Sequence, residues 1–282
     1  NKTTPKIFVL DLVKTIILLA VFGGSAFVIV LWLFQEVGES AWIYCWITLT
    51  ILQVAIMFVA PYVILPLFNK YTPLEEGELR SRIEQYAESQ NFRIKGVYKM
   101  DGSKRSSKSN AFFTGFGRSK RIVLFDTLIE KHTVDELVTV IAHEMGHYKK
   151  KHVPQAMVRS IVKTGLMFFL LSLFIDNPGL FEAFGMEHMS IYAGFIFFGF
   201  LFAPVSMALS LFETALSRKH EYESDNYAVK TTGQPEVLIN ALKKLSVDNL
   251  GNLTPHPLKV IVGYSHPPVL DRIQAIRNSK SP

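Results

Sequence analysis

Four long apolar runs dominate the hydrophobic pattern of the chain. Residues 15–34, 41–68 and 189–212 contain no charged side chain, and a further run over about 153–175 contains only two basic residues. Because about 20 apolar residues suffice to cross a bilayer, each run is predicted to be a transmembrane helix. A buried helix of a soluble domain is the alternative for any one of them.

The pattern changes between residues 69 and 151. The stretch EEGELRSRIEQYAESQNF places Leu79, Ile83 and Tyr86 at helical spacing, which predicts an amphipathic helix. The runs IKGVYKMDG, NAFFTGFG and KRIVLFDTLI follow, separated by Gly, Ser and Lys, and predict a small hairpin sheet. The expected fold is therefore mainly α: a multi-span helical membrane protein whose extramembrane domain contains a small β-sheet.

The stretch VDELVTVIAHEMGHYKKKHV carries the first candidate chemistry. Thr133 followed by Glu136 is typical of a capping box at the start of a helix. Helical residues four apart lie one above the other, so His143 and His147 can bind one zinc ion. Glu144 between them is the usual water-activating base of such a motif. The alternative is that these are solvated residues of an ordinary helix.

A third metal ligand is expected in LSRKHEYESDNYAV, which continues the last apolar run without Gly or Pro. Glu221 and Asp225 share one helical face, whereas Glu223 points about 160° away and is interpreted as a solvated acid. We predict Glu221 as the ligand and Asp225 as the hydrogen-bond partner of a ligand histidine. His220 is a competing ligand, although two histidines and one glutamate form the usual hydrolytic set.

Composition and charge refine the setting. The chain has 282 residues, of which 49% are hydrophobic and 19% charged, which is unusually apolar for a soluble protein. Two loops, 35–40 and 176–190, carry acids and neither Lys nor Arg, so both termini and the segment 69–151 are predicted to face the cytoplasm. The net charge of +6 favours membrane lipid headgroups. No nucleic-acid partner is expected, because the basic residues alternate with acids and no recognised motif accompanies them.

Several blocks, taken in order, resemble the integral-membrane CAAX prenyl protease 1 family of zinc metalloproteases. They are SKRSSKSNAFFTGFGRSKRIVLFDTL, HEMGH, LSRKHEYESDNYAV, DNLGN and YSHPPVLDRIQAI. The resemblance implies that one zinc ion per chain is bound by His143, His147 and Glu221. Glu144 would be the catalytic acid–base, and Asp225 matches the family's acid behind the metal site.

The same resemblance suggests roles for residues outside the metal motif. His266 and Arg272 match positions expected near the scissile carbonyl, where either could donate a hydrogen bond to the oxyanion. Asn110, with Ala111 and Phe112 beside it, matches the strand that grips the substrate by backbone hydrogen bonds. Members of the family have seven spans and this chain shows four. Since it begins with Asn and lacks a signal-peptide cleavage pattern, we expect a further N-terminal portion.

The implied activity is hydrolysis of a peptide bond near the C-terminus of prenylated CAAX peptides or proteins. Zinc-bound water would attack the carbonyl, and Glu144 would assist by taking its proton. An HtpX-like protease for membrane-protein quality control would use the same residues and is the main alternative. A non-catalytic, zinc-stabilised membrane adaptor or transporter is a third possibility, but it gives Glu144 no purpose. The membrane would be the endoplasmic reticulum in a eukaryote and the plasma membrane in a bacterium.

These expectations divide the chain into four segments. Residues 1–68 and 153–216 each hold two transmembrane spans. Residues 69–152 form a cytoplasmic catalytic segment with the hairpin sheet and the zinc-motif helix, and residues 217–282 form a C-terminal catalytic segment with the third zinc ligand.

Overall fold

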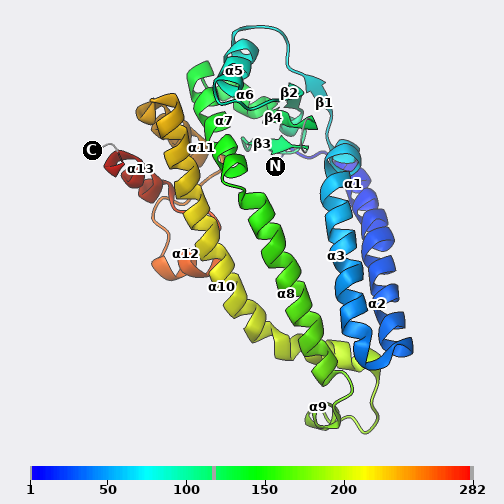
Figure 1. Cartoon of the computed structure of the whole chain (residues 1–282). Helices are drawn as coiled ribbons and strands as arrows, with labels where there is room; N and C mark the ends of the chain where they lie inside the picture. The colour runs from blue at the N-terminus through cyan, green and yellow to red at the C-terminus, as the bar shows by residue number, and fades with distance from the viewer. Residues whose placement is uncertain (1, 116–118, 280–282) are drawn as a thin grey trace. The chain divides into compact units, whose positions relative to one another are not determined.

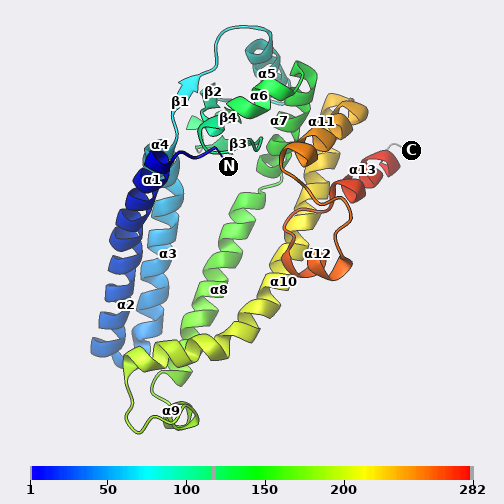
Figure 2. The same ribbon diagram turned by 180° about the vertical axis from the view of Figure 1, so that it is seen from behind.

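The computed structural model describes residues 2–115 and 119–279 and divides into two compact units (Figures 1 and 2). The sheet unit comprises Asn1–Phe8, Phe58–Val153 and Leu211–Pro282. The helical unit comprises Val9–Met57 and Pro154–Ser210. Each unit is built from segments far apart in the sequence, and helices that begin in one unit continue into the other.

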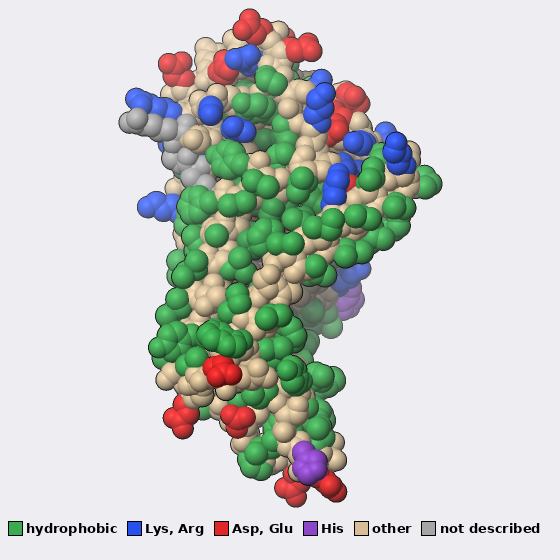
Figure 3. Space-filling view, turned by 90° about the vertical axis from the view of Figure 1, so that its right-hand side faces the viewer, with side chains coloured by type: hydrophobic (Ala, Val, Ile, Leu, Met, Phe, Trp, Pro, Cys, Tyr) green, Lys and Arg blue, Asp and Glu red, His purple; other side chains and the backbone are tan. Residues whose placement is uncertain are grey.

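Within the described residues, four helical stretches are long and apolar enough to cross a membrane, as the hydrophobic pattern predicts. Their helices are α1 (Pro5–Leu18), α2 (Ser25–Glu36), α3 (Ala41–Val59), α4 (Leu65–Phe68), α8 (His152–Phe174) and α10 (Ile191–Thr232), with π-helical turns at Leu19–Gly24 and Ala60–Ile64. Hydrophobic side chains cover the surface of the spans in Figure 3, and acidic side chains mark the end near α9 (Pro178–Ala183). An apolar outer surface of this kind suits contact with lipid.

Polar contacts and a glycine hold α3 against α8 within the helical unit. The indole N–H of Trp46 donates to the carbonyl oxygen of Ile161 at 2.9 Å, and the amide of Gln53 donates to the hydroxyl of Ser160 at 2.8 Å. A Cβ atom at Gly165 would lie 2.9 Å from the Trp46 ring, so glycine permits this close approach. Small residues and interhelical hydrogen bonds are the usual means of joining helices in lipid.

The described part of the sheet unit contains four strands in the order β1-β2-β4-β3. They are β1 (Tyr71–Pro73), β2 (Gly96–Met100), β3 (Ala111–Thr114) and β4 (Arg121–Phe125). Only β3 and β4 form the expected hairpin, because β2 pairs with β4 in parallel and β1 adds to the far edge of β2. The prediction of a simple hairpin sheet is therefore corrected to a mixed sheet. Parallel pairing requires a crossover, which the short β-rich runs do not reveal.

Helices pack around the sheet and contribute to the core of this unit. They are α5 (Glu78–Ser89), α6 (Asp126–Lys131), α7 (Val134–Lys149), α11 (Pro235–Asp248) and α13 (Val269–Asn278). A further short helix, α12 (Pro257–Gly263), buries none of its side chains. The predicted amphipathic helix is confirmed as α5, with Ile83 and Tyr86 buried. The motif helix α7 contacts α5, α11 and β3 and buries Leu137, Ile141 and Met145.

The start of α7 is fixed by the predicted capping box, which the structure confirms. The hydroxyl of Thr133 accepts a hydrogen bond from the backbone N–H of Glu136 at 3.3 Å, and the Glu136 carboxylate accepts from the backbone N–H of Thr133 at 2.9 Å. Lys244 of α11 also donates to this carboxylate at 2.7 Å. These contacts set the position of the helix that carries the histidine motif.

Candidate metal centre

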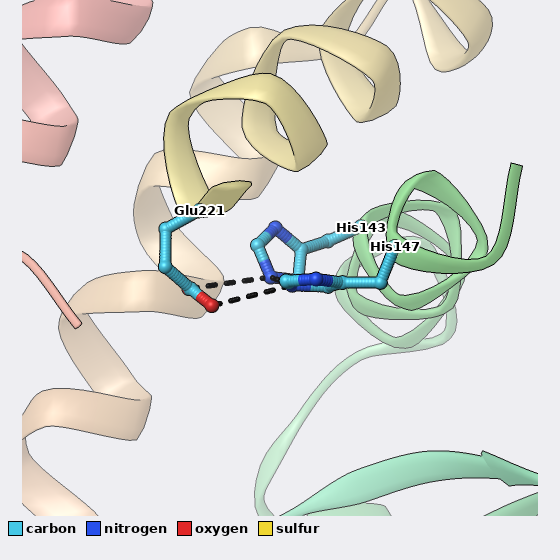
Figure 4. Close-up of side chains that lie close together, drawn as sticks. All are labelled: His143, His147 and Glu221. Atoms are coloured by element: carbon cyan, nitrogen blue, oxygen red, sulfur yellow. Dashed lines mark hydrogen bonds and ion pairs between the residues drawn. The ribbon is translucent and has the colours of Figure 1, made fainter. Parts of the chain in front are cut away.

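Three side chains from two helices converge at one point. His143 and His147 of α7 face Glu221 of α10 (Figure 4). The two Nε2 atoms lie 3.2 Å apart. The Nε2 atom of His147 lies 3.2 Å from Oε1 of Glu221, and that of His143 lies 3.5 Å from Oε2. Donors about 2.0–2.1 Å from a tetrahedral zinc ion are roughly 3.4 Å apart, so the spacing fits such an ion.

The close approach of α7 and α10 depends on a glycine within the motif. A Cβ atom at Gly146 would lie 2.9 Å from the Cα atom of Ser224. Any larger residue would push the two backbones apart, since helix separation is set by the side chains at the crossing point. Gly146 therefore allows the histidines of one helix to meet the acids of the other.

Glu221 is a buried carboxylate held among positive and polar groups. Its side chain is only 4% exposed, and its two oxygens lie within 3.5 Å of His143, His147 and Arg272. Despite burial, these neighbours lower the pKa of the Glu221 carboxyl, so it is available as an anionic ligand. Together with the two imidazoles, it forms a donor set suited to zinc. His220, the competing ligand of the sequence prediction, lies outside this cluster of ligand atoms among the described residues.

Behind His143 lies a buried, charged assembly. The Nδ1 atom of His143 is 2.8 Å from Oδ1 of Asp225, as expected for an acid that orients a ligand histidine. Arg272 of α13 donates to both Asp225 oxygens, through Nε at 2.8 Å and Nη2 at 2.6 Å. Its Nη1 atom lies 3.2 Å from Oε2 of Glu221. All three guanidinium nitrogens thus face the two acids.

The ionisable groups of α7 respond to this environment. Burial alone would lower the pKa of His143, but its hydrogen bonds to Asp225 and Glu221 raise the pKa to about 9. A proton and a metal ion would compete for the same imidazole. Desolvation by the surrounding protein raises the pKa of the Glu144 carboxyl, although the neighbouring histidines act in the opposite direction.

His266 lies at the open side of the cluster. It precedes α13, and its side chain is 66% exposed. Its Nε2 atom is 3.3 Å from Oε1 of Glu221, and its Nδ1 atom is 2.9 Å from the hydroxyl of Ser265. The structure thus brings His266 to the ligand cluster while leaving most of its ring accessible to solvent.

The predicted substrate strand lies at the edge of the sheet. β3 pairs with β4 on one side only and contacts α7. Asn110 is exposed and immediately precedes β3, whereas Ala111 and Phe112 lie within it. The end of the stretch NAFFTGFG lies outside the described residues, which resume at position 119.

Two residues of the block DNLGN hold the start of this strand, a role that sequence reasoning did not assign. The hydroxyl of Ser109 donates to Asp248 at 2.8 Å, and the backbone N–H of Ser109 donates to the side-chain oxygen of Asn249 at 3.2 Å. Lys131 donates to the same Asp248 carboxylate at 2.9 Å. The polar residues of the block were the only feature of the sequence that could have indicated this role.

Glu223 is not the solvated acid that helical geometry suggested. Its Oε2 atom lies 3.0 Å from Nε2 of His152, and Lys219 approaches its other oxygen at 3.8 Å. Sequence reasoning did not single out His152, which lies between the motif helix and the third apolar run. In the structure α7 ends at Lys149 and α8 begins at His152, and this break brings the His152 ring to His147.

Comparison with known proteins is consistent with this geometry. Residues 73–280 match the family model of peptidase family M48, and residues 1–70 match that of the CAAX prenyl protease N-terminal region, described as five membrane helices. The chain is 35% identical to CAAX prenyl protease 1 of Saccharomyces cerevisiae over 98% of this chain and 64% of that protein. It is 39% identical to a homolog from Oryza sativa subsp. japonica over 100% of this chain and 66% of that protein.

The fold also matches a solved structure. The crystal structure of S. mikatae Ste24p aligns with a TM-score of 0.91 at 36% identity, covering 98% of this chain and 68% of that one. The chain thus spans about two thirds of the length of these relatives. The membrane-helix match and the candidate spans show an integral membrane protein. On its fold, its histidine–glutamate cluster and its matches, the chain belongs to peptidase family M48, among the CAAX prenyl protease 1 proteins.

Proposed function

We propose that the protein is a zinc-dependent endopeptidase of the membrane that cleaves prenylated CAAX proteins near their C-terminus. The observation that carries this proposal is the convergence of His143, His147 and Glu221 at one point, with Glu144 on the same helix. The names of the relatives supply the substrate class. The membrane spans hold the protein in the bilayer, with which a prenylated substrate would associate.

We propose that one zinc ion per chain is bound by the three clustered side chains. Three protein ligands leave one tetrahedral position open, as in catalytic rather than structural zinc sites. Zinc bound there would act as a Lewis acid toward water and the peptide carbonyl. An open position argues against the adaptor alternative, which requires a closed metal site.

Glu144 is proposed as the general base and acid. Electrostatic interactions of its carboxyl with His143, His147 and Glu221 support a role in taking a proton from the attacking water. The same carboxyl would then return the proton to the leaving amine. Because desolvation raises the pKa of Glu144, its protonated form is more accessible near neutral pH than that of an exposed glutamate.

The contacts divide the roles expected of Arg272 and His266. Arg272 uses its three guanidinium nitrogens on Asp225 and Glu221, so we assign it to positioning these acids. His266 keeps most of its ring exposed beside Glu221 and remains the better candidate to donate a hydrogen bond to the oxyanion.

Strand β3 is proposed to hold the substrate in an extended conformation. The carbonyl oxygen of Asn110 accepts from the N–H of Phe125 at 3.0 Å. Alternation along an antiparallel pair then turns the backbone groups of Phe112 toward β4 and those of Ala111 and Phe113 toward the open edge. The side-chain oxygen of Asn110 holds the N–H of Ala111 at 2.9 Å. Phe113 therefore offers the outward N–H that remains for a peptide.

A matched pair of variants tests this use of the strand. Phe113→Pro removes the outward N–H without removing a bond to β4, whereas Phe113→Ala keeps the N–H. Both variants lose the contact of the Phe113 ring with Phe92. We expect a higher KM for the proline variant than for the alanine variant. Equal KM values would count against backbone capture at this residue.

The prenyl chain requires an apolar environment. A cavity of about 320 Å³ in the helical unit is lined by apolar side chains, among them Phe27, Phe168, Phe195 and Phe202, and offers such an environment.

We propose that the catalytic segments face the cytoplasm, because the charged residues of loops 35–40 and 176–190 are all acidic. The membrane would be the endoplasmic reticulum in a eukaryote and the plasma membrane in a bacterium.

The decisive experiment compares cleavage of a farnesylated CAAX peptide with that of its unprenylated twin by the purified protein in detergent. Glu144→Gln should lower kcat by about 10²–10⁴ while zinc remains bound. A metal chelator should abolish cleavage, and zinc should restore it. Equal cleavage of both peptides would favour the quality-control alternative. A zinc-loaded protein that cleaves neither peptide would contradict the proposal.

A further inference from the structure

A second histidine lies directly behind the metal-binding edge of His147. The Nδ1 atom of His147 is 3.0 Å from the Nδ1 atom of His152. On its other edge, the Nε2 atom of His152 is 3.0 Å from Oε2 of Glu223. These contacts form a continuous line from the ligand cluster through two imidazole rings to a carboxylate.

A metal ion at Nε2 of His147 and the Glu223 carboxylate together determine where the protons of the two rings lie. When Nε2 of His147 binds a metal ion, a neutral ring must carry its proton on Nδ1 and donate from there. The facing Nδ1 of His152 must then accept, so the His152 proton belongs on Nε2. At that position it is donated to the Glu223 carboxylate. Each polar atom has a partner only with this set of tautomers.

His152 is held firmly enough to impose this arrangement. Its side chain is 4% exposed, and its ring stacks on that of His220 with 3.9 Å between centroids and 7° between planes. The chain reaches this position through Lys151, whose φ of +59° lies in the left-handed region. That conformation separates α7 from α8 and lets His152 turn back toward His147.

We propose that His152, anchored by Glu223, is a positioning residue that fixes the tautomer and ring orientation of the metal ligand His147. The inference rests on the proposed function, because it requires that His147 bind zinc through Nε2. Partners of this kind typically change metal affinity about 10–100-fold when they are removed. Because His152 is buried and contacts His147, its effect would be exerted through His147.

Two substitutions of His152 separate hydrogen bonding from packing. His152→Phe keeps a ring to stack on His220 but removes the acceptor for His147. His152→Asn loses the stacking but places an amide oxygen close to the former Nδ1 position. The full-length chain in detergent is titrated with zinc against a competing chelator. We expect zinc binding about 10–100-fold weaker in the phenylalanine variant and largely retained in the asparagine variant.

Cobalt substitution supplies a readout that does not depend on catalysis. The visible absorption of bound Co²⁺ should change in His152→Phe, because His147 is free to rotate or change tautomer. It should stay close to that of the native protein in His152→Asn. A phenylalanine variant with native zinc affinity and a native cobalt spectrum would overturn the inference.

A second pair of variants covers the case in which His152→Phe fails to fold. Glu223 is 37% exposed, so Glu223→Leu should preserve the fold while removing the anchor of His152. Lys219→Met is the matched control, because Lys219 contacts the same carboxylate and is 69% exposed. Zinc binding should weaken in Glu223→Leu and stay native in Lys219→Met. Native affinity in both would overturn the inference. A native chain that binds no zinc would instead contradict the proposed function.

Discussion

The two candidate ligand histidines differ in what stands behind their Nδ1 atoms. His143 faces the carboxylate of Asp225, which Arg272 clamps with two hydrogen bonds in a buried environment. His147 faces the imidazole of His152, and charge enters only at the half-exposed Glu223. The two candidate ligands thus contact groups of very different electrostatic character. We expect the first side to dominate the stability of the protein and the second to act mainly on metal binding.

The largest expected effect on stability comes from removing the charged partner behind His143. Arg272→Ala leaves Asp225 and Glu221 buried without their cation, which should lower the free energy of unfolding by about 3–5 kcal/mol. Chemical unfolding in detergent, after a chelator has removed any metal from the protein, measures this loss. Arg272→Lys is the control, because it restores the charge but not the forked geometry, and it should recover part of the loss. A loss below about 1 kcal/mol in Arg272→Ala, the range of surface ion pairs, would remove the contrast.

The position of His152 behind His147 can be changed through the backbone at Lys151. Lys151 adopts a left-handed conformation that a β-branched residue tolerates poorly, so Lys151→Val should cost about 1–2 kcal/mol and displace His152. Lys151→Gly loses the same charge but accepts the conformation, and it should retain native zinc affinity. Zinc titration and thermal unfolding of the two variants measure the difference. If both variants bind zinc equally well, the turn does not control His152.

A substitution at the start of α7, away from the partners of both histidines, should affect His143 and His147 equally, because α7 carries both. Burial works to raise the pKa of Glu136, but its hydrogen bonds to Lys244 and Thr133 lower the pKa overall. A carboxylate with a lowered folded pKa contributes stability above its unfolded pKa, and this is lost as pH falls through the folded value. Glu136→Gln should therefore destabilise the protein by about 1 kcal/mol at pH 7.

The pH dependence provides the check on this capping contact. The difference in unfolding free energy between the native protein and Glu136→Gln should shrink as pH falls below the ordinary value of 4.5. Unfolding curves at pH 7 and at progressively lower pH measure that difference. A difference that stays constant with pH would show that the Glu136 charge does not stabilise α7.

The smallest expected effect on stability lies at the exposed end of the neutral side. Glu223→Ala should change the unfolding free energy by less than about 1 kcal/mol, because its carboxylate is half-exposed and screened. Zinc affinity should nevertheless fall in this variant. Measuring both quantities on one preparation tests the split directly. A large loss of stability would place Glu223 in the same class as Asp225.

Local patterns in the sequence were sufficient to predict much of the site. The capping box at Thr133 fixed the start of α7, and the i, i+4 rule singled out Glu221 and Asp225 on one face of α10. Uninterrupted apolar length predicted the spans. These features depend on neighbours within a few turns of helix, which periodicity records.

The features that sequence analysis missed depend on distant contacts or on local breaks in geometry. Glu223 finds its partner 71 positions away, and the parallel pairing of β2 with β4 joins strands without a tight turn. The role of Arg272 depends on burial against two acids of another helix. No periodicity signals that Lys151 leaves the helical conformation and redirects His152.

The most direct test of the metal site is the zinc content of the purified protein together with zinc X-ray absorption. Native protein should hold one zinc ion per chain, with two imidazole nitrogens and oxygen donors at about 2.0–2.2 Å. Glu221→Ala should lose most of its zinc after dialysis against a weak chelator. A native protein without zinc, or a Glu221→Ala variant that keeps a full equivalent in an unchanged environment, would contradict this assignment.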